Sequence, residues 1–254
     1  MQLSVEWFIS TGFGHTMAWG AYMNLNFSYK EIIGYILLFS AFILVPLWGN
    51  HAVMTQSQSL ETGNCVVIDA GHGGIDGGAV SPGGEKESHI NLQISQKLES
   101  VMQLLGIRTK MIRTTDRSIH ISGNTIAAQK VSDIRERVRI VNTTPKALLV
   151  SIHQNNFTDS QYYGAQVFHN RLDGSDQLAE MLQTNFRTAI NPQNKRQCKK
   201  AAGIYLMDHI NCRGVLIECG FLSNPQEAQQ LMDGEYQKKL CCVIAATVSQ
   251  YLNT

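Results

Sequence analysis

The chain has 254 residues, enough for one large domain or two small ones, and its 44% hydrophobic content is typical of a globular protein. Its 21 Lys and Arg residues nearly balance its 20 Asp and Glu residues, so there is no broad basic surface and no indication of a nucleic-acid partner. The six cysteines include no Cys-x-x-Cys pair, which argues against a structural zinc knuckle, and they are too few for a disulfide scaffold.

The amino-terminal part of the chain contains a strongly apolar segment at 32–49, which carries no charged residue. Its length is close to the minimum that spans a bilayer core. We therefore expect a membrane anchor or signal sequence there, with an uncleaved anchor preferred, followed by a polar linker at 50–64. The extension at 1–31 lacks the short basic leader of a signal anchor, so Met23 is an alternative start.

Strand-like and helix-like segments alternate along the rest of the chain, 65–254. Short β-branched runs indicate strands, and apolar residues at helical spacing indicate helices. The strands are expected at 65–70, 107–112, 147–152, 165–169, 203–207 and 214–218, and the helices at 91–105, 133–141, 175–189, from 225, and from 236 to the end. This alternation predicts one α/β domain with a mostly parallel twisted sheet flanked by helices on both faces.

Three polar residues lie at or just past the ends of apolar strands: His72, His153 and Glu218. Ligand sites in parallel sheets gather at the carboxyl ends of the strands. His72 lies in the loop GHGGIDGG, whose glycines permit positive φ and close approach of a ligand. A dinucleotide fingerprint is excluded because Asp76 occupies its sixth position, and no Gly-Lys-Ser/Thr follows for a phosphate loop. The loop therefore favours metal binding or proton transfer.

Two histidines at strand ends suggest a zinc site. Hydrolytic zinc sites use three N or O ligands and leave one position for water, so a third ligand has to be a carboxylate or another histidine. The candidates near the glycine-rich loop are Asp69, Asp76, Glu85, Glu87 and His89. Spacing alone does not choose between them.

Glu218 ends a strand whose other residues are apolar. A carboxylate in such a place is costly unless it pairs, coordinates a metal or stays protonated. These conditions suit a catalytic acid/base with a raised pKa. The alternative is a salt bridge to Arg113 or Arg135.

Several motifs occur in a fixed order: VVIDAGHGG, a Glu-Lys-Glu turn, IRTTD, a helix with Arg137 and Asn142, SIHQN and IECGFLSN. Together they resemble the zinc-dependent N-acetylmuramoyl-L-alanine amidase family. The resemblance runs from about Cys65 to Leu252 and leaves the amino-terminal segment outside. It implies hydrolysis of the amide between N-acetylmuramic acid and L-alanine in peptidoglycan, with Zn²⁺ as the cofactor.

The resemblance assigns the metal ligands to His72, Glu87 and His153, and the catalytic acid/base to Glu218. Glu87 is chosen over Glu85 because the family glutamate stands five positions before the helix leucine, here Leu92. The chain departs from the usual pattern at two positions, Ser88 for Lys and Ala70 for Pro.

Arg113, Arg137 and Asn155 are candidates for substrate binding, because a guanidinium fork suits the carboxylates of a stem peptide. Helix and loop hydrogen bonding is the alternative for these residues. At the level of the whole protein, the alternatives are a non-catalytic peptidoglycan-binding or regulatory module and a zinc peptidase that cuts stem peptides.

A narrower resemblance is to the sporulation amidase of the spore cortex. It rests on the segment before the Arg137 helix, the GAQVF strand, the AAGIYLM stretch and the IECGFLSNPQEA ending. It implies removal of stem peptides for muramic-δ-lactam formation, a functional link to a muramic acid deacetylase, and a role in germination. An activating protein partner is a further expectation. The catalytic domain is expected outside the cytoplasm, in the cell wall or spore intermembrane space, held by the membrane helix or secreted if that helix is cleaved.

Overall fold

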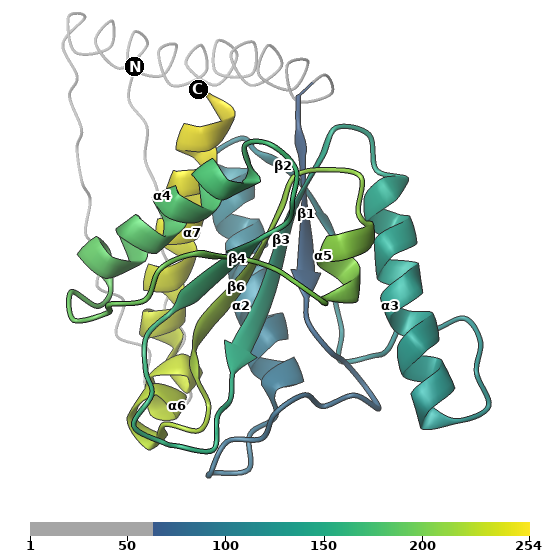
Figure 1. Cartoon of the computed structure of the whole chain (residues 1–254), viewed down its shortest axis with the longest axis horizontal. Helices are drawn as coiled ribbons and strands as arrows, with labels where there is room; N and C mark the ends of the chain where they lie inside the picture. Colours follow the sequence, from purple (N-terminus) through teal and green to yellow (C-terminus); the bar gives the residue numbers. More distant parts are fainter. Residues whose placement is uncertain (1–62) are drawn as a thin grey trace, which may run out of the picture. The chain divides into compact units, whose positions relative to one another are not determined.

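The computed structural model describes residues 63–254, so the predicted extension, the membrane segment and most of the linker lie outside the described residues. Strands and helices alternate along the described chain (Figure 1). The elements are β1 Cys65–Ala70, α2 Glu87–Leu104, β2 Arg108–Met111, α3 Ile126–Asn142, β3 Ala147–Asn155, β4 Gln166–His169, α4 Ser175–Ala189, β5 Lys199–Lys200, α5 Tyr205–His209, β6 Gly214–Phe221, α6 Pro225–Met232 and α7 Gly234–Leu252. Within 63–254 no helix has the length and apolar character needed to cross a membrane.

The strands form one six-stranded sheet in the order β2-β1-β3-β6-β4-β5. All neighbouring pairs are parallel except β4 and β6, which run antiparallel. The central strands are continuous apolar runs because both of their faces are buried, as expected for a parallel sheet between helices. The predicted α/β fold with a mostly parallel sheet is confirmed.

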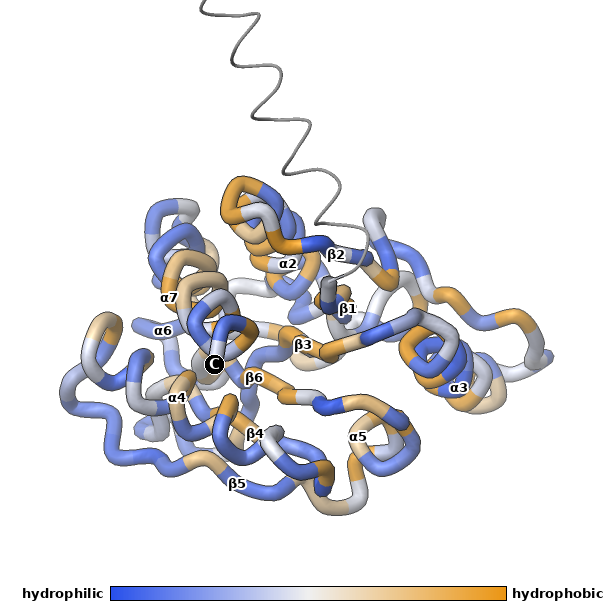
Figure 2. Tube along the Cα trace, turned by 90° about the horizontal axis from the view of Figure 1, so that it is seen from above, coloured by the Kyte–Doolittle hydropathy of each residue, from blue (hydrophilic) through white to orange (hydrophobic). Residues whose placement is uncertain are grey.

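Helices cover both faces of the sheet (Figures 1 and 2). Side chains of alternate residues in a strand point to opposite faces. Val66, Val150 and Ile217 belong to the core beneath α2, α4, α6 and α7. Val67 and Leu149 belong to a smaller core beneath α3 and α5. Each such side chain contributes about 1.5–3 kcal/mol when fully buried. Several polar side chains of the strands point to the same face of the sheet as the smaller core. They are those of Asp69, Ser151, His153, Glu218 and Gln166.

One predicted strand is wrong. The segment at 203–207 was expected to be extended, but Tyr205–His209 forms the helix α5, and the edge strand β5 is the preceding pair Lys199–Lys200. The helical turn packs both Leu206 and Met207 into the smaller core. A short apolar run satisfies either periodicity, so the sequence pattern did not distinguish the two.

Several boundaries also move, with consequences for the site. Helix α2 begins at Glu87 rather than at residue 91, which places Glu87 in its first turn. Helix α3 begins at Ile126, where the Thr125 side chain accepts a hydrogen bond from the N–H of Ala128 at 3.2 Å. Strand β3 extends to Asn155, so His153, which was expected just after the strand, lies within it. Strand β6 extends to Phe221, so Glu218 is not its last residue.

Candidate metal and catalytic site

The loop between β1 and α2 has the backbone that its glycines suggested. His72 itself adopts a positive φ of 61°, a conformation that few non-glycine residues take. At Gly71 an added Cβ would lie 2.2 Å from Cε1 of His153, and at Gly78 it would lie 2.5 Å from a carboxylate oxygen of Glu87. These glycines are therefore required because the backbone packs directly against the rings and carboxylate of the site.

His72, Glu87 and His153 form one cluster. Nε2 of His72 lies 3.2 Å from Oε2 of Glu87, and Nδ1 of His153 lies 3.0 Å from Oε1 of Glu87. One ligand atom from each residue lies within 4.8 Å of the others, which is compatible with a shared metal ion. Two nitrogens and one carboxylate oxygen are a donor set that suits zinc. Of the open candidates for the third position, Glu85 is excluded by geometry, because its carboxylate bonds His89 at 3.0 Å instead.

The carboxylate of Glu87 is held by three further groups. Its Oε1 accepts hydrogen bonds from the N–H of Gln154 at 3.1 Å and from Nδ2 of Asn91 at 3.2 Å, and its Oε2 accepts from the N–H of Ala79 at 2.9 Å. Burial opposes ionisation, but His153 and His72 outweigh it and hold the pKa of Glu87 well below its usual range. The carboxylate is therefore charged and fixed in orientation.

His72 is oriented by a chain of two charged residues. Its Nδ1 lies 2.9 Å from Oδ2 of Asp76, and the other oxygen of Asp76 lies 2.7 Å from Nζ of Lys130 on α3. Because a carboxylate only accepts, Nδ1 carries the proton and Nε2 faces the cluster. Burial lowers the pKa of His72, but Glu87 and Asp76 outweigh it and raise that pKa to about 9. Carboxylates placed behind a histidine in this way orient metal ligands in proteins.

Glu218 lies beside this cluster. It is paired in register with His153 across β3 and β6. Its Oε2 is buried and, among the described residues, has no hydrogen-bond partner. Burial raises the pKa of Glu218 to about 7, although His153 acts in the opposite direction. The alternative of a salt bridge to Arg113 or Arg135 is wrong, since neither forms an ion pair with Glu218. A buried, unpaired carboxyl with this pKa can both take and return a proton near neutrality.

Two arginines predicted to contact substrate, Arg113 and Arg137, bind the backbone next to His72. Arg113 is 1% exposed, and its guanidinium donates to the carbonyls of Ala70 at 2.8 Å, Gly71 at 2.9 Å and Ser88 at 2.8 Å. Its donors are therefore occupied by backbone carbonyls close to His72 and Glu87. This agrees with the hydrogen-bonding alternative for Arg113, and a direct substrate contact by Arg113 stays a prediction.

Arg137 on α3 is occupied in the same way. It forms a buried ion pair with Asp69 at 2.5 Å and donates to the carbonyls of Ala70 at 2.9 Å and His72 at 2.6 Å. A second carboxylate, that of Asp133, lies 2.6 Å from its Nε. Arg137 thus anchors the loop that carries His72, and a substrate contact by Arg137 stays a prediction.

Asn155, the third predicted substrate residue, is the last residue of β3 and pairs in register with Phe221 of β6. Its carbonyl accepts a hydrogen bond from the N–H of Leu222 at 2.8 Å. Its half-buried side chain lies near the same end of the sheet as His153. A substrate contact by Asn155 stays a prediction.

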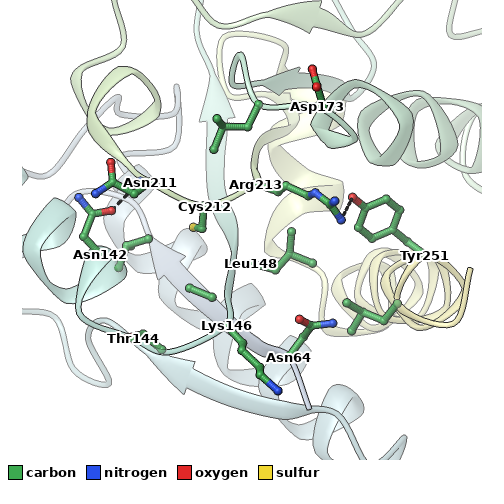
Figure 3. A pocket seen from close by; sticks show the side chains of 14 residues that line it. Asn64, Asn142, Thr144, Lys146, Leu148, Asp173, Asn211, Cys212, Arg213 and Tyr251 are labelled. Carbon is green, nitrogen blue, oxygen red and sulfur yellow. Dashed lines mark hydrogen bonds between the residues drawn. The ribbon is translucent and has the colours of Figure 1, made fainter. Parts of the chain in front are cut away.

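A cavity of about 620 Å³ lies elsewhere in the domain (Figure 3). It is lined by Asn64, Ala147, Leu148, Arg213 and Tyr251, among others, and Nη1 of Arg213 lies 3.1 Å from the hydroxyl of Tyr251. Asn64 precedes β1, Ala147 begins β3 and Arg213 precedes β6, so the cavity lies at the amino ends of these strands. The His72–Glu87–His153 cluster lies at the carboxyl ends of the strands, so the cavity is at the opposite end of the sheet and is separate from the cluster.

Residues 66–250 match the family described as N-acetylmuramoyl-L-alanine amidase. The chain belongs to this amidase family. This amidase is 31% identical over 222 residues to the germination-specific N-acetylmuramoyl-L-alanine amidase of Bacillus subtilis, covering 87% of this chain and 92% of that one. It is also 27% identical over 233 residues to the amidase AmiA of Escherichia coli, covering 74% of this chain and 76% of that one.

A solved structure agrees with these relatives. The amidase is similar to CwlD from Clostridioides difficile, solved in complex with the GerS lipoprotein, with 34% sequence identity and a TM-score of 0.72. The similarity covers 75% of this chain and 98% of CwlD. The fold and the enzyme class predicted from the motifs are confirmed.

Some residues around the site were missed or misplaced by sequence reasoning. Asp76 was considered as a metal ligand, but it lies behind His72. Lys130 was not considered, because it comes from a different helix and approaches the loop only in the folded chain. Gln166 lies beside Glu218 only through the pairing of β4 with β6, and Arg196 donates to Gln166 from a later loop. The spacing of four between His72 and Asp76 was the one local signal.

Proposed function

We propose that this amidase is zinc-dependent, with the metal held by His72, Glu87 and His153 and with Glu218 as the acid/base. The bond that it hydrolyses is the amide between N-acetylmuramic acid and L-alanine in peptidoglycan. The observation that carries the proposal is the meeting of three N and O ligand atoms within 4.8 Å beside the buried, unpartnered oxygen of Glu218. The donor set fits zinc, and Asp76 behind His72 supports it as an orienting carboxylate.

Zinc at this site would polarise the amide carbonyl and lower the pKa of water. The chain itself supplies the proton transfers. Glu218, with its pKa raised to about 7, accepts a proton from the water molecule that attacks the carbonyl carbon. It then returns the proton to the departing nitrogen of L-alanine, which would otherwise be a very poor leaving group. The pairing of Glu218 with His153 supports this role, because it puts the carboxyl beside one of the proposed metal ligands.

The biological setting is proposed from the relatives. Similarity to the germination-specific amidase supports spore-cortex peptidoglycan as the substrate and muramic-δ-lactam formation, with a deacetylase, as the outcome. The complex of CwlD with GerS supports an activating protein partner for this amidase as well. We further propose that the segment at 32–49 holds the catalytic domain outside the cytoplasm, where peptidoglycan lies.

The test is mass spectrometry of purified peptidoglycan digested by the zinc-loaded chain, beside the variant Glu218→Gln. Free stem peptides that begin with L-alanine, absent from the variant, are expected. Cleavage within the stem peptide would identify a zinc peptidase instead. Binding to peptidoglycan without any release, in the presence of zinc, would identify a non-catalytic module.

A further inference from the structure

A row of polar side chains crosses the sheet at the site. His153 of β3 pairs with Glu218 of β6, and Glu218 pairs in turn with Gln166 of β4. Side chains of directly paired residues lie on the same face of a sheet. The row therefore begins at the metal cluster, passes through Glu218 and continues to Gln166.

Arg196 continues this row beyond Gln166. Its Nη1 donates to Oε1 of Gln166 at 3.3 Å, and its Nε donates to the carbonyl of Tyr163 at 2.8 Å. Gln166 is itself fixed, because its Nε2 donates to the carbonyl of Gln197 at 3.0 Å. The guanidinium also lies over the ring of Phe221, with Cζ 4.3 Å from the ring centroid. Packing and hydrogen bonds thus hold the Arg196 guanidinium in one orientation next to the row.

Part of this guanidinium is free to bind a ligand. Arg196 is half-buried, and its Nη2 donates to no residue within 63–254. No carboxylate of the described chain forms an ion pair with it. The nearby carboxylate of Glu227 is engaged with the N–H groups of Gly164 and Phe221, both at 2.9 Å. Arg196 is therefore a cation that is oriented by the fold and not neutralised by an ion pair.

The surface beside Arg196 is aromatic and exposed. Tyr162 is 42% exposed and its ring centroid lies 5.8 Å from Cζ of Arg196. Phe157, which is 53% exposed, packs edge-on against Tyr162 with ring centroids 5.0 Å apart. These rings give a ligand on Arg196 an apolar surface to lie against.

We propose that Arg196 binds a carboxylate of the stem peptide, on the leaving-group side of the scissile amide. This inference rests on the proposed function of the site. The order along the row matches the order along the substrate: the carbonyl at the metal cluster, the alanine nitrogen at Glu218, and the peptide beyond it toward Gln166 and Arg196. A planar guanidinium with a free edge suits a carboxylate.

The experiment is calorimetric titration of the intact zinc-loaded chain with a synthetic stem tripeptide, L-Ala-γ-D-Glu-meso-diaminopimelate, and with the same peptide carrying carboxamides in place of its carboxylates. Neither ligand contains the scissile amide, so binding is measured without turnover. The intact chain is expected to bind the carboxylate form about tenfold or more tightly than the carboxamide form, because a charge-assisted hydrogen bond contributes that much. Arg196→Gln is expected to lose this preference.

Two further variants are needed as controls. Arg196→Lys keeps the charge without the planar fork, so it is expected to keep part of the preference, and it covers the case in which Arg196→Gln unfolds. Arg171→Gln removes an exposed arginine just after β4, at the opposite end of the sheet, and is expected to keep the full preference. Thermal unfolding of each variant separates a loss of binding from a loss of fold.

The outcomes distinguish this inference from the proposed function. An equal preference in Arg196→Gln and the intact chain overturns the role of Arg196, even if stem peptides are released from peptidoglycan. An intact chain without preference overturns it too. A preference that disappears in Arg196→Gln supports the role, even if the digestion shows cleavage at another bond.

Discussion

Replacement of Arg137 by leucine is expected to destabilise the domain strongly, because this arginine is the cation of a buried ion pair. Its side chain is 3% exposed and that of Asp69 is 1% exposed, and the two lie 2.5 Å apart. Removing one partner leaves Asp69 as an uncompensated buried charge. Such a change costs about 3–5 kcal/mol of the free energy of unfolding.

The assay is urea unfolding followed by circular dichroism. With a slope of about 1–3 kcal/mol per molar urea, a loss of this size lowers the unfolding midpoint by at least about 1 M. The matched control is Arg139→Leu, two residues further along α3. Arg139 also forms a 2.5 Å ion pair, with Glu136, but its side chain is 60% exposed, so little change is expected.

The two variants differ in the burial of the ion pair that each one removes. Equal midpoints for Arg137→Leu and Arg139→Leu would refute the claim that burial makes the Arg137–Asp69 pair important. A second readout is zinc binding, since Arg137 also donates to the carbonyl of His72 at 2.6 Å. Folded Arg137→Leu protein is expected to bind zinc more weakly, whereas Arg139→Leu is expected to bind it normally.

Three other predictions concern the same site. Asp76→Asn is expected to weaken zinc binding about 10–100-fold, measured by competition with a chromophoric chelator, because it changes the group that orients His72; unchanged affinity would contradict that role. Gly71→Ala places a Cβ 2.2 Å from the His153 ring, so zinc binding should fall while most of the fold remains, as near-ultraviolet circular dichroism would show. Acid should also destabilise the domain through Asp69: burial opposes its ionisation, but Arg137 outweighs this and holds its pKa below the usual value. A carboxyl whose pKa is lower in the folded state stabilises the fold fully above its unfolded pKa of about 3.9, and this contribution is lost as the pH falls through the folded pKa. Urea unfolding midpoints are therefore expected to fall from pH 6 to pH 2, and to fall less steeply in Arg137→Leu.

The sequence alone was sufficient for most of the fold. The β-branched run at 65–70 and the amphipathic segment at 175–189 have the observed bounds of β1 and α4. These elements are decided by local periodicity, which the sequence displays directly. The segment at 203–207 was misread because a run of a few apolar residues fits a strand and a helical turn equally well.

The sequence also located the centre of the site. His72, His153 and Glu218 were singled out because each ends an apolar strand, and the carboxyl ends of neighbouring parallel strands meet at one edge of the sheet. The choice of Glu87 needed the family motif, and the structure then brought it between the two histidines while Glu85 bonded His89. Spacing gave no reason for that choice, because both glutamates are close to the loop in sequence.

Only the tertiary structure decided what the arginines do. Residue type alone does not distinguish Arg113, Arg137 and Arg196, because each offers the same planar donor group. In the folded chain the first two are buried, with their donors occupied by backbone carbonyls and carboxylates, whereas Arg196 keeps a free edge beside Gln166. The difference comes from which strands and helices pack side by side, and contacts between residues tens of positions apart are fixed by packing of the whole domain and not by local sequence.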